Sequence, residues 1–245
     1  ASPTGGYLAG EEQNTLADIA TDSYSVFGQI DYDLDDDLVL VAGLRLVQEN
    51  KSLDGQLVQN ANLDDRVIEV DDTATPLVDV ALENDKFMWS AKLQLDYKPN
   101  EDTLLYAGVN RGVKAGNFNA PLGGAFSTYD PEVLLAYEAG AKLTLMDGKA
   151  QVNSSVFYYD YEDYQSFSWV NNAGVVFNEQ AHFTGAEVEI LLNPVDALDI
   201  MLGASYTDAV VEDLEVASGI FVDTTPPYTP EWQGSALIRY TWSLD

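Results

Sequence analysis

The side chains in this sequence that could carry out chemistry are mostly carboxylates. The chain has 41 Asp and Glu residues against 11 Lys and Arg, a single histidine, His182, and no cysteine. A Ser-His-Asp triad needs a histidine held beside its serine, and protein zinc sites are built from several His or Cys ligands. No phosphate-binding or dinucleotide-binding glycine motif occurs either. We therefore expect no enzyme: no catalytic residue, no cofactor and no dedicated metal site.

One acidic run has the spacing at which a calcium loop begins. Asp31, Asp33 and Asp35 alternate as the first ligands of such a loop do. However, Asp36 stands where the loop requires Gly, and Ala42 where it requires a bidentate Glu. The run therefore predicts an ordinary solvated hairpin turn.

The overall charge of −30 limits the possible partners. Nucleic acid is excluded, because binding its phosphates requires clustered Lys and Arg. The acidity fits either simple solubility, as in a salty habitat, or a mouth that attracts cations. The most acidic segment, residues 51–85, is interpreted as a solvated loop, with capture of Ca²⁺ as the alternative.

A period of two dominates the chain, which is the pattern of strands with two different faces. Between residues 86 and 98, for example, apolar side chains alternate with Ser90, Lys92 and Gln94. The pattern predicts an all-β fold without helices, an antiparallel meander of about nine strands. Alternation fits a soluble sandwich as well as a barrel, and the connections, aromatic spacing and charges described next predict that the meander forms part of a transmembrane β-barrel. The expected strands are residues 23–33, 37–50, 86–98, 102–116, 132–146, 149–161, 182–193, 197–208 and 232–243.

The expected connections alternate in length along the chain. Short turns are expected near residues 33–37, 98–102, 146–149 and 193–197. Between them lie long links at 51–85, 117–130, 162–180 and 208–231. Outer-membrane barrels have short turns at one end of their strands and long loops at the other, whereas a soluble sandwich has no reason to separate them.

Aromatic residues recur on three of these strands at a constant interval. Each pair is eight residues apart on one strand face: Tyr24 and Tyr32, Trp89 and Tyr97, Trp232 and Tyr240. Eight residues span about 26 Å, or roughly 20 Å along the membrane normal at a tilt of ~40°. That is close to the apolar band of a barrel, whose edges carry rings of Tyr and Trp.

The two faces of the expected strands differ in charge. One face is uncharged along the centre of most strands. A face that contacts lipid is expected to be so, because a Lys or Arg at the bilayer midplane costs ~2–4 kcal/mol. The other face carries charges of both signs, and such a face suits a wet interior. Its charged residues are Arg45, Lys92, Glu138, Lys142, Glu187, Glu189 and Arg239. The face of the 102–116 strand is ambiguous, because Arg111 shares parity with Val109 and Val113. Two alternatives remain: a passive porin-type barrel, and a secreted acidic β-sandwich that binds sugars or calcium.

Several runs resemble motifs of TonB-dependent outer-membrane receptors, in the order and spacing of that family. The run from Leu104 to Asn119 resembles the family's "YASVSRGFKAGGFN" strand. Others match shorter patterns: Ser25–Gln29, Pro131–Glu132 followed by Tyr137–Lys142, Phe157–Gln165 and Gly185–Glu189.

The resemblance implies a 22-stranded barrel in the outer membrane, plugged by an N-terminal domain. Such a receptor imports a scarce nutrient, for example an iron-siderophore chelate, with energy delivered by TonB. Its implied partners are the lipid bilayer, the plug domain, TonB and a small-molecule ligand. Nothing in residues 1–245 resembles the plug, the TonB-contacting segment or the last family strands, and nine strands are too few for the barrel. We therefore expect one partial barrel domain from the later half of such a protein.

Ligand-contact residues are the least determined feature of the sequence. Tyr164, Phe167 and Trp169 cluster in the expected loop at 162–180, where they would either pack or contact a ligand. Arg45, Arg111 and Lys142 are interpreted as interior charges that hold neighbouring strands or a plug.

Overall fold

The computed structural model describes residues 12–60, 76–120, 125–170 and 173–242. All regular structure in these ranges is β, which confirms the predicted all-β class. The strands are β1 (Glu12–Asp33), β2 (Leu38–Asn60), β3 (Val78–Glu83), β4 (Lys86–Asn100), β5 (Thr103–Lys114), β6 (Asn117–Asn119), β7 (Ser127–Tyr129), β8 (Glu132–Leu145), β9 (Ala150–Val170), β10 (Ala173–Val195), β11 (Leu198–Ala217), β12 (Ile220–Thr224) and β13 (Trp232–Tyr240).

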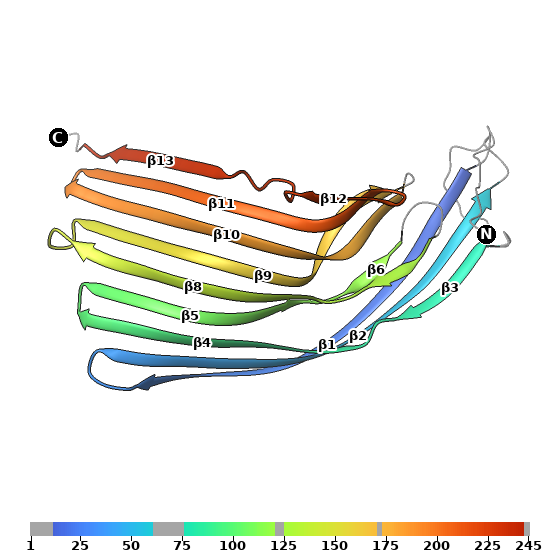
Figure 1. Cartoon of the computed structure of the whole chain (residues 1–245), viewed down its shortest axis with the longest axis horizontal. Helices are drawn as coiled ribbons and strands as arrows, with labels where there is room; N and C mark the ends of the chain where they lie inside the picture. The colour runs from blue at the N-terminus through green and yellow to red at the C-terminus, as the bar shows by residue number, and fades with distance from the viewer. Residues whose placement is uncertain (1–11, 61–75, 121–124, 171–172, 243–245) are drawn as a thin grey trace.

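Nine long strands form one antiparallel meander, as predicted. Their order is β1-β2-β4-β5-β8-β9-β10-β11-β13, with β3 added to β2 and β12 to β11. The sheet is curved and open, and β1 and β13 form its two long edges (Figure 1). The connections at 34–37, 101–102, 146–149 and 196–197 all lie at one end, here called the turn end. The opposite end, called the loop end, carries β3, β6, β7 and β12.

The expected long loops are wrong in extent, because the strands continue into them. Segment 162–180 is not a loop: β9 and β10 pair across it up to the contact between Val170 and Ala173. Segments 51–85 and 208–231 likewise begin as continuations of β2 and β11, and segment 117–130 contains the small β6–β7 hairpin. The acidic residues of 61–75 lie outside the described residues.

The described residues form a single layer, with no second sheet packed on the apolar rows. The accessible surface is 16308 Å² for a chain of 26.8 kDa. A soluble monomer of that mass would expose roughly 10,800 Å². A sandwich would have buried these rows, so the layer argues against the β-sandwich alternative.

Register places the predicted faces consistently across the sheet. Leu44, for example, lies opposite Gly28 on β1 and Ala91 on β4, and Leu202 lies opposite Ile190 and Ala236. At the centre of the charged face side chains are crowded, so that Val41, Val47 and Met88 are less than 10 % exposed. Many large side chains on the uncharged face splay apart and are 40–70 % exposed, among them Tyr24, Leu44 and Leu93. The charged face is therefore concave and the uncharged face convex.

Candidate functional site

The convex face carries two rows of aromatic side chains. Near the loop end lie Tyr24, Trp89, Tyr137, Tyr158, Tyr206 and Trp232. Two cross-strand pairs join members of this row: Tyr137 with Tyr158, at 6.4 Å between ring centroids, and Tyr206 with Trp232, at 4.8 Å. Near the turn end lie Tyr32, Tyr97 and Tyr240. We call these rows the upper belt and the lower belt.

The register between the belts measures the tilt of the strands. Cross-strand pairing runs from Tyr32 on β1 through Leu40, Leu95 and the following strands to Trp232 on β13. If Tyr24 and Trp232 lie at one depth, the level therefore shifts by eight residues over the eight steps from β1 to β13. At 3.3 Å per residue and 4.8 Å per strand, this corresponds to a tilt of roughly 35°. Transmembrane barrels have tilts of about 35–45°.

The concave face is polar, and its contacts run between neighbouring strands. Tyr106 Oη donates a hydrogen bond to Glu138 at 2.6 Å, and Ser155 Oγ donates one to Glu187 at 3.1 Å. Arg239 Nε donates to Asp199 at 2.7 Å. A cavity of about 520 Å³ lies along this wall, and polar side chains line it: Tyr106, Lys142, Asn153, Ser155, Glu187, Glu189, Ser205, Gln233 and Ser235. Such a wall suits a watery interior or a polar partner.

Two glycines let aromatic rings lie flat along this wall. A Cβ at Gly140 would stand 2.6 Å from the Tyr106 ring and 2.5 Å from the Ser154 carbonyl oxygen. A Cβ at Gly185 would stand 2.4 Å from the Phe157 ring. Because the rings cover backbone in place of projecting inward, the interior of the sheet stays open.

We expect Gly140→Ala to destabilise the sheet by about 1–3 kcal/mol, since the added methyl must displace Tyr106 and its bond to Glu138. Urea unfolding of the detergent-solubilised protein would measure this loss. Gly43→Ala is the control, because a Cβ there meets nothing closer than 3.8 Å. Equal stability of the two variants would contradict the account.

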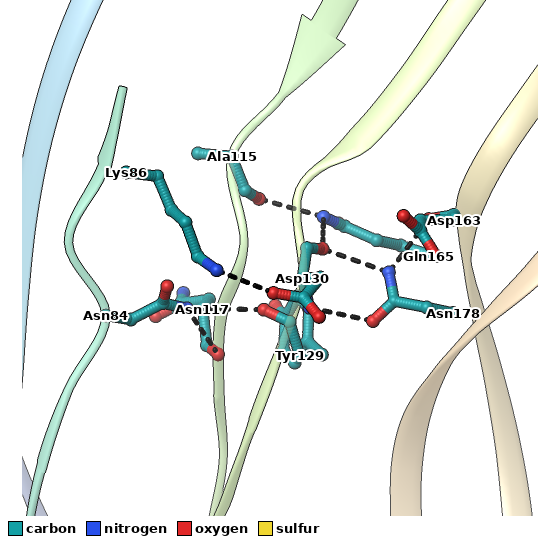
Figure 2. A network of polar contacts seen from close by, with 9 residues as sticks. All are labelled: Asn84, Lys86, Ala115, Asn117, Tyr129, Asp130, Asp163, Gln165 and Asn178. Atoms are coloured by element: carbon teal, nitrogen blue, oxygen red, sulfur yellow. Dashed lines mark hydrogen bonds and ion pairs between the residues drawn. The ribbon is translucent and has the colours of Figure 1, made fainter. Parts of the chain in front are cut away.

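At the loop end, side-chain amides hold the β6–β7 hairpin between its neighbours (Figure 2). Asn178 receives a hydrogen bond from the Asp130 amide at 2.7 Å and donates to the Asp130 carbonyl at 3.0 Å. Asn119 likewise accepts a hydrogen bond from the Val176 amide at 2.9 Å and donates one to the Val176 carbonyl at 3.1 Å. Each amide thus replaces one rung of a β-ladder. We call this set of contacts the amide clamp.

Further contacts tie the hairpin to both sides of the sheet. Gln165 donates to the carbonyls of Ala115 and Asp130, at 2.8 and 3.2 Å. On the other side, Lys86 pairs with Asp130 at 2.8 Å. Asn84 donates to the Tyr129 carbonyl at 3.2 Å. The hairpin is therefore connected to β4 as well as to β9 and β10.

Of the three expected ligand contacts, Tyr164 lies apart from the other two. It packs against Tyr161 and Phe183, at 5.3 and 5.8 Å between ring centroids, beside the buried Ala181 and Val211. Burial, and then the charge of Glu132, raises the pKa of Tyr164. Tyr164 is therefore part of a small core at the loop end.

Phe167 and Trp169 do come together. Their rings meet edge to face at 5.7 Å, and the side chains are 56 % and 62 % exposed. Near Asp163, two residues of β9 lie opposite a single residue of β10. This bulge reverses the alternation of side chains between the two faces along β9. Tyr164 therefore shares the face of Tyr161, and the pair, three and five residues further along β9, lies on the opposite, convex face. It belongs to β9 rather than to a loop.

The interpretation of Arg111 as an interior charge is wrong. Its partners in register, Ala91 and Leu135, are members of the convex rows. The other two, Arg45 and Lys142, lie on the concave face, in register with Ser90 and Asn153. Its parity with Val109 and Val113 left the face of the strand ambiguous in the sequence, and expecting every charge to lie inside was the error.

Carboxylates gather near the loop end without forming a metal site. Burial raises the pKa of Glu179, and the nearby charges of Asp213 and Glu215 raise it further. The ionised form of Glu179 therefore destabilises this region, and the effect is relieved as the pH falls. Within the described ranges, no group of three or more His, Cys, Asp or Glu side chains could hold a metal ion. The same ranges contain no helix long and apolar enough to cross a membrane.

Solved structures share this sheet. The chain superposes on the ferric yersiniabactin uptake receptor FyuA from Yersinia pestis with a TM-score of 0.72 and 14 % identity, covering 92 % of this chain and 32 % of that one. The ferric-catecholate import receptor Fiu from E. coli K12, in its closed form, gives 0.67 and 17 %, with 91 % and 32 % covered. The copper transporter OprC gives 0.67 and 16 %, with 92 % and 33 % covered.

This chain thus spans about a third of the length of these receptors, and at such identities the likeness concerns the fold alone. The family assignment comes from the sequence. A family model described as TonB dependent receptor-like, beta-barrel, matches residues 1–245. Together with the belts, the tilt and the two-faced single sheet, this match shows that the chain belongs to the TonB-dependent receptor β-barrel family.

Proposed function

We propose that this chain forms part of the barrel wall of an outer-membrane receptor that imports a scarce nutrient, such as a ferric siderophore, with energy from TonB. The single observation that carries the proposal is the division of the sheet into an uncharged convex face between two aromatic belts and a charged concave face. The convex face would contact lipid. The concave face would surround a plug domain and the route of the ligand.

The nature of the cargo is supported by the functions of the similar structures. Two of them take up ferric chelates, and a third, OprC, is a copper transporter. The cargo class is therefore a metal chelate, with iron as the first choice and copper as the second. A passive porin is disfavoured by the family match.

Growth of cells under metal limitation would test the function. Deleting the gene for the full-length receptor should abolish growth on one ferric chelate while growth on free iron salts continues. A parallel series with copper chelates distinguishes the two metals. Normal uptake of every chelate by the deletion strain would contradict the proposal.

We further propose that the Phe167–Trp169 pair contacts the ligand at the outer rim of the loop end, before the ligand enters the concave interior. Both rings remain more than half exposed beyond the upper belt, whereas Tyr164 is already packed in the loop-end core. We expect replacement of Phe167 and Trp169 by Ser in the full-length receptor to weaken ligand binding about tenfold, as loss of an aromatic contact does. Tyr228→Ser is the matched control, because Tyr228 is a fully exposed loop aromatic. Unchanged affinity of the double variant would remove these two residues from the site and leave the uptake function untouched.

A further inference from the structure

Arg111 is an exception to the division of charge between the two faces. Nine other basic residues lie in the described ranges. Seven share the concave face, namely Arg45, Lys51, Lys86, Lys92, Lys114, Lys142 and Arg239, and two lie at the turn end, Lys98 and Lys149. Among the described residues, Arg111 is therefore the only Lys or Arg whose side chain projects from the convex face between the turn end and the upper belt. A charge in that position requires a partner or a polar environment, because its desolvation is costly.

The depth of Arg111 corresponds to the upper belt. The level that joins Tyr24 to Trp232 shifts by one residue per strand, and on β4 it reaches Trp89. On β5 the same level falls between Arg111 and Val113. The guanidinium is thus placed where Trp and Tyr mark the boundary between hydrocarbon and headgroups.

The local contacts orient Arg111 but do not neutralise it. Its Cζ lies 4.0 Å from the centroid of the Trp89 ring, and its Nη1 donates to the Trp89 carbonyl. No carboxylate of the described residues lies within ion-pair distance of it. Its neighbours in register, Ala91 and Leu135, are apolar. A guanidinium has five N–H donors, so several remain available toward the outside.

We propose that Arg111, held on the ring of Trp89, binds the phosphate of an anionic lipid headgroup in the leaflet around the loop end. This inference rests on the proposed placement of the barrel in a membrane. The chemistry fits, because a planar guanidinium binds two phosphate oxygens at once. A lipid is favoured over free phosphate because its chains can cover the apolar side chains beneath the site, such as Val109 and Leu46.

The experiment uses the full-length receptor, purified from phosphatidylcholine vesicles that contain phosphatidylglycerol. Native mass spectrometry would count the phosphatidylglycerol molecules retained by wild type, Arg111→Gln, Arg111→Lys and Arg45→Gln. We expect Arg111→Gln to bind phosphatidylglycerol about fivefold less tightly, because one basic residue near an anionic surface contributes about 1 kcal/mol. Arg111→Lys should be intermediate, because it keeps the charge without the planar fork. Arg45→Gln, on the concave face, should equal wild type.

Each outcome has a definite meaning. Equal retention by wild type and Arg111→Gln, with both inserted into vesicles, would overturn the lipid site alone. Failure of wild type to insert would overturn the proposed membrane function and the site with it. Displacement of the lipid by excess inorganic phosphate would show that any phosphate suffices, and would overturn the assignment to a lipid.

Discussion

Leu93→Arg should largely prevent the barrel from assembling in a bilayer. Leu93 lies midway between Trp89 and Tyr97, at the centre of the convex band, and its cross-strand partners are Ala42 and Val109. The side chain is 51 % exposed although it is apolar. An arginine at that depth costs ~2–4 kcal/mol, which shifts the folding equilibrium roughly 30- to 1,000-fold. Folding of the full-length receptor into vesicles, followed by protease resistance, would measure the effect.

The neighbouring residue provides the control for this experiment. Gln94 is adjacent on the same strand but faces the concave side, opposite Val41 and Gly108. Gln94→Arg should therefore fold almost as wild type does, since its charge enters a polar interior. If both variants assembled equally well, the convex face would not be the lipid face. The belts would then need another explanation.

The architecture could be predicted from local patterns because each face of a strand meets a single environment. A period of two, short turns at one end and paired aromatics are local features, and all of them depend on residues close in sequence. The register between strands adds the tilt of the sheet, which no single strand contains. It aligns the three aromatic pairs along one tilt of about one residue per strand.

The loop end could not be predicted in the same way, because its strands break their own period. Asp163 and Asp213 both adopt positive φ, at 56° and 50°, and register shifts occur beside them. A shift of one residue moves every later side chain to the opposite face. Beyond such a point, alternation counted from the earlier part of the strand gives the wrong face, so Tyr164 comes to lie beside Tyr161. Tyr164 was grouped with Phe167 and Trp169 because all three were expected in a loop, where alternation assigns no face.

The amide clamp and the contacts beside it also could not be foreseen, although several of the residues involved belong to the family-like motifs. Asn119 lies 57 residues from its partner Val176, and Gln165 lies 50 residues from Ala115. Glu132 accepts the backbone amide of Gln165 at 2.9 Å. These motifs looked like strand sequence, yet part of their role is to hold a hairpin at the loop end. Only the pairing of distant strands reveals that role.

Asn178→Leu is expected to release the hairpin while leaving the sheet intact. The change keeps a similar volume but removes the partner of the Asp130 N–H and of the Asp163 carbonyl, and one of the two donors to the Asp130 carbonyl. Hydrogen bonds of this kind contribute about 0.5–1.5 kcal/mol each, so losing two or three of them should make local opening roughly 10- to 100-fold more frequent. Amide hydrogen exchange, read by mass spectrometry across residues 117–130, would measure that frequency.

The matched control is Asn50→Leu, because the Asn50 amide is exposed and its oxygen accepts a bond only from Gln48, two residues away. That variant should leave exchange in the hairpin unchanged. Asn119→Leu should reproduce the effect from the opposite side by freeing Val176. If hairpin exchange in Asn178→Leu remained at the wild-type rate, Lys86 and Gln165 would suffice to hold it. The amides would then be incidental to how this end of the barrel keeps its shape.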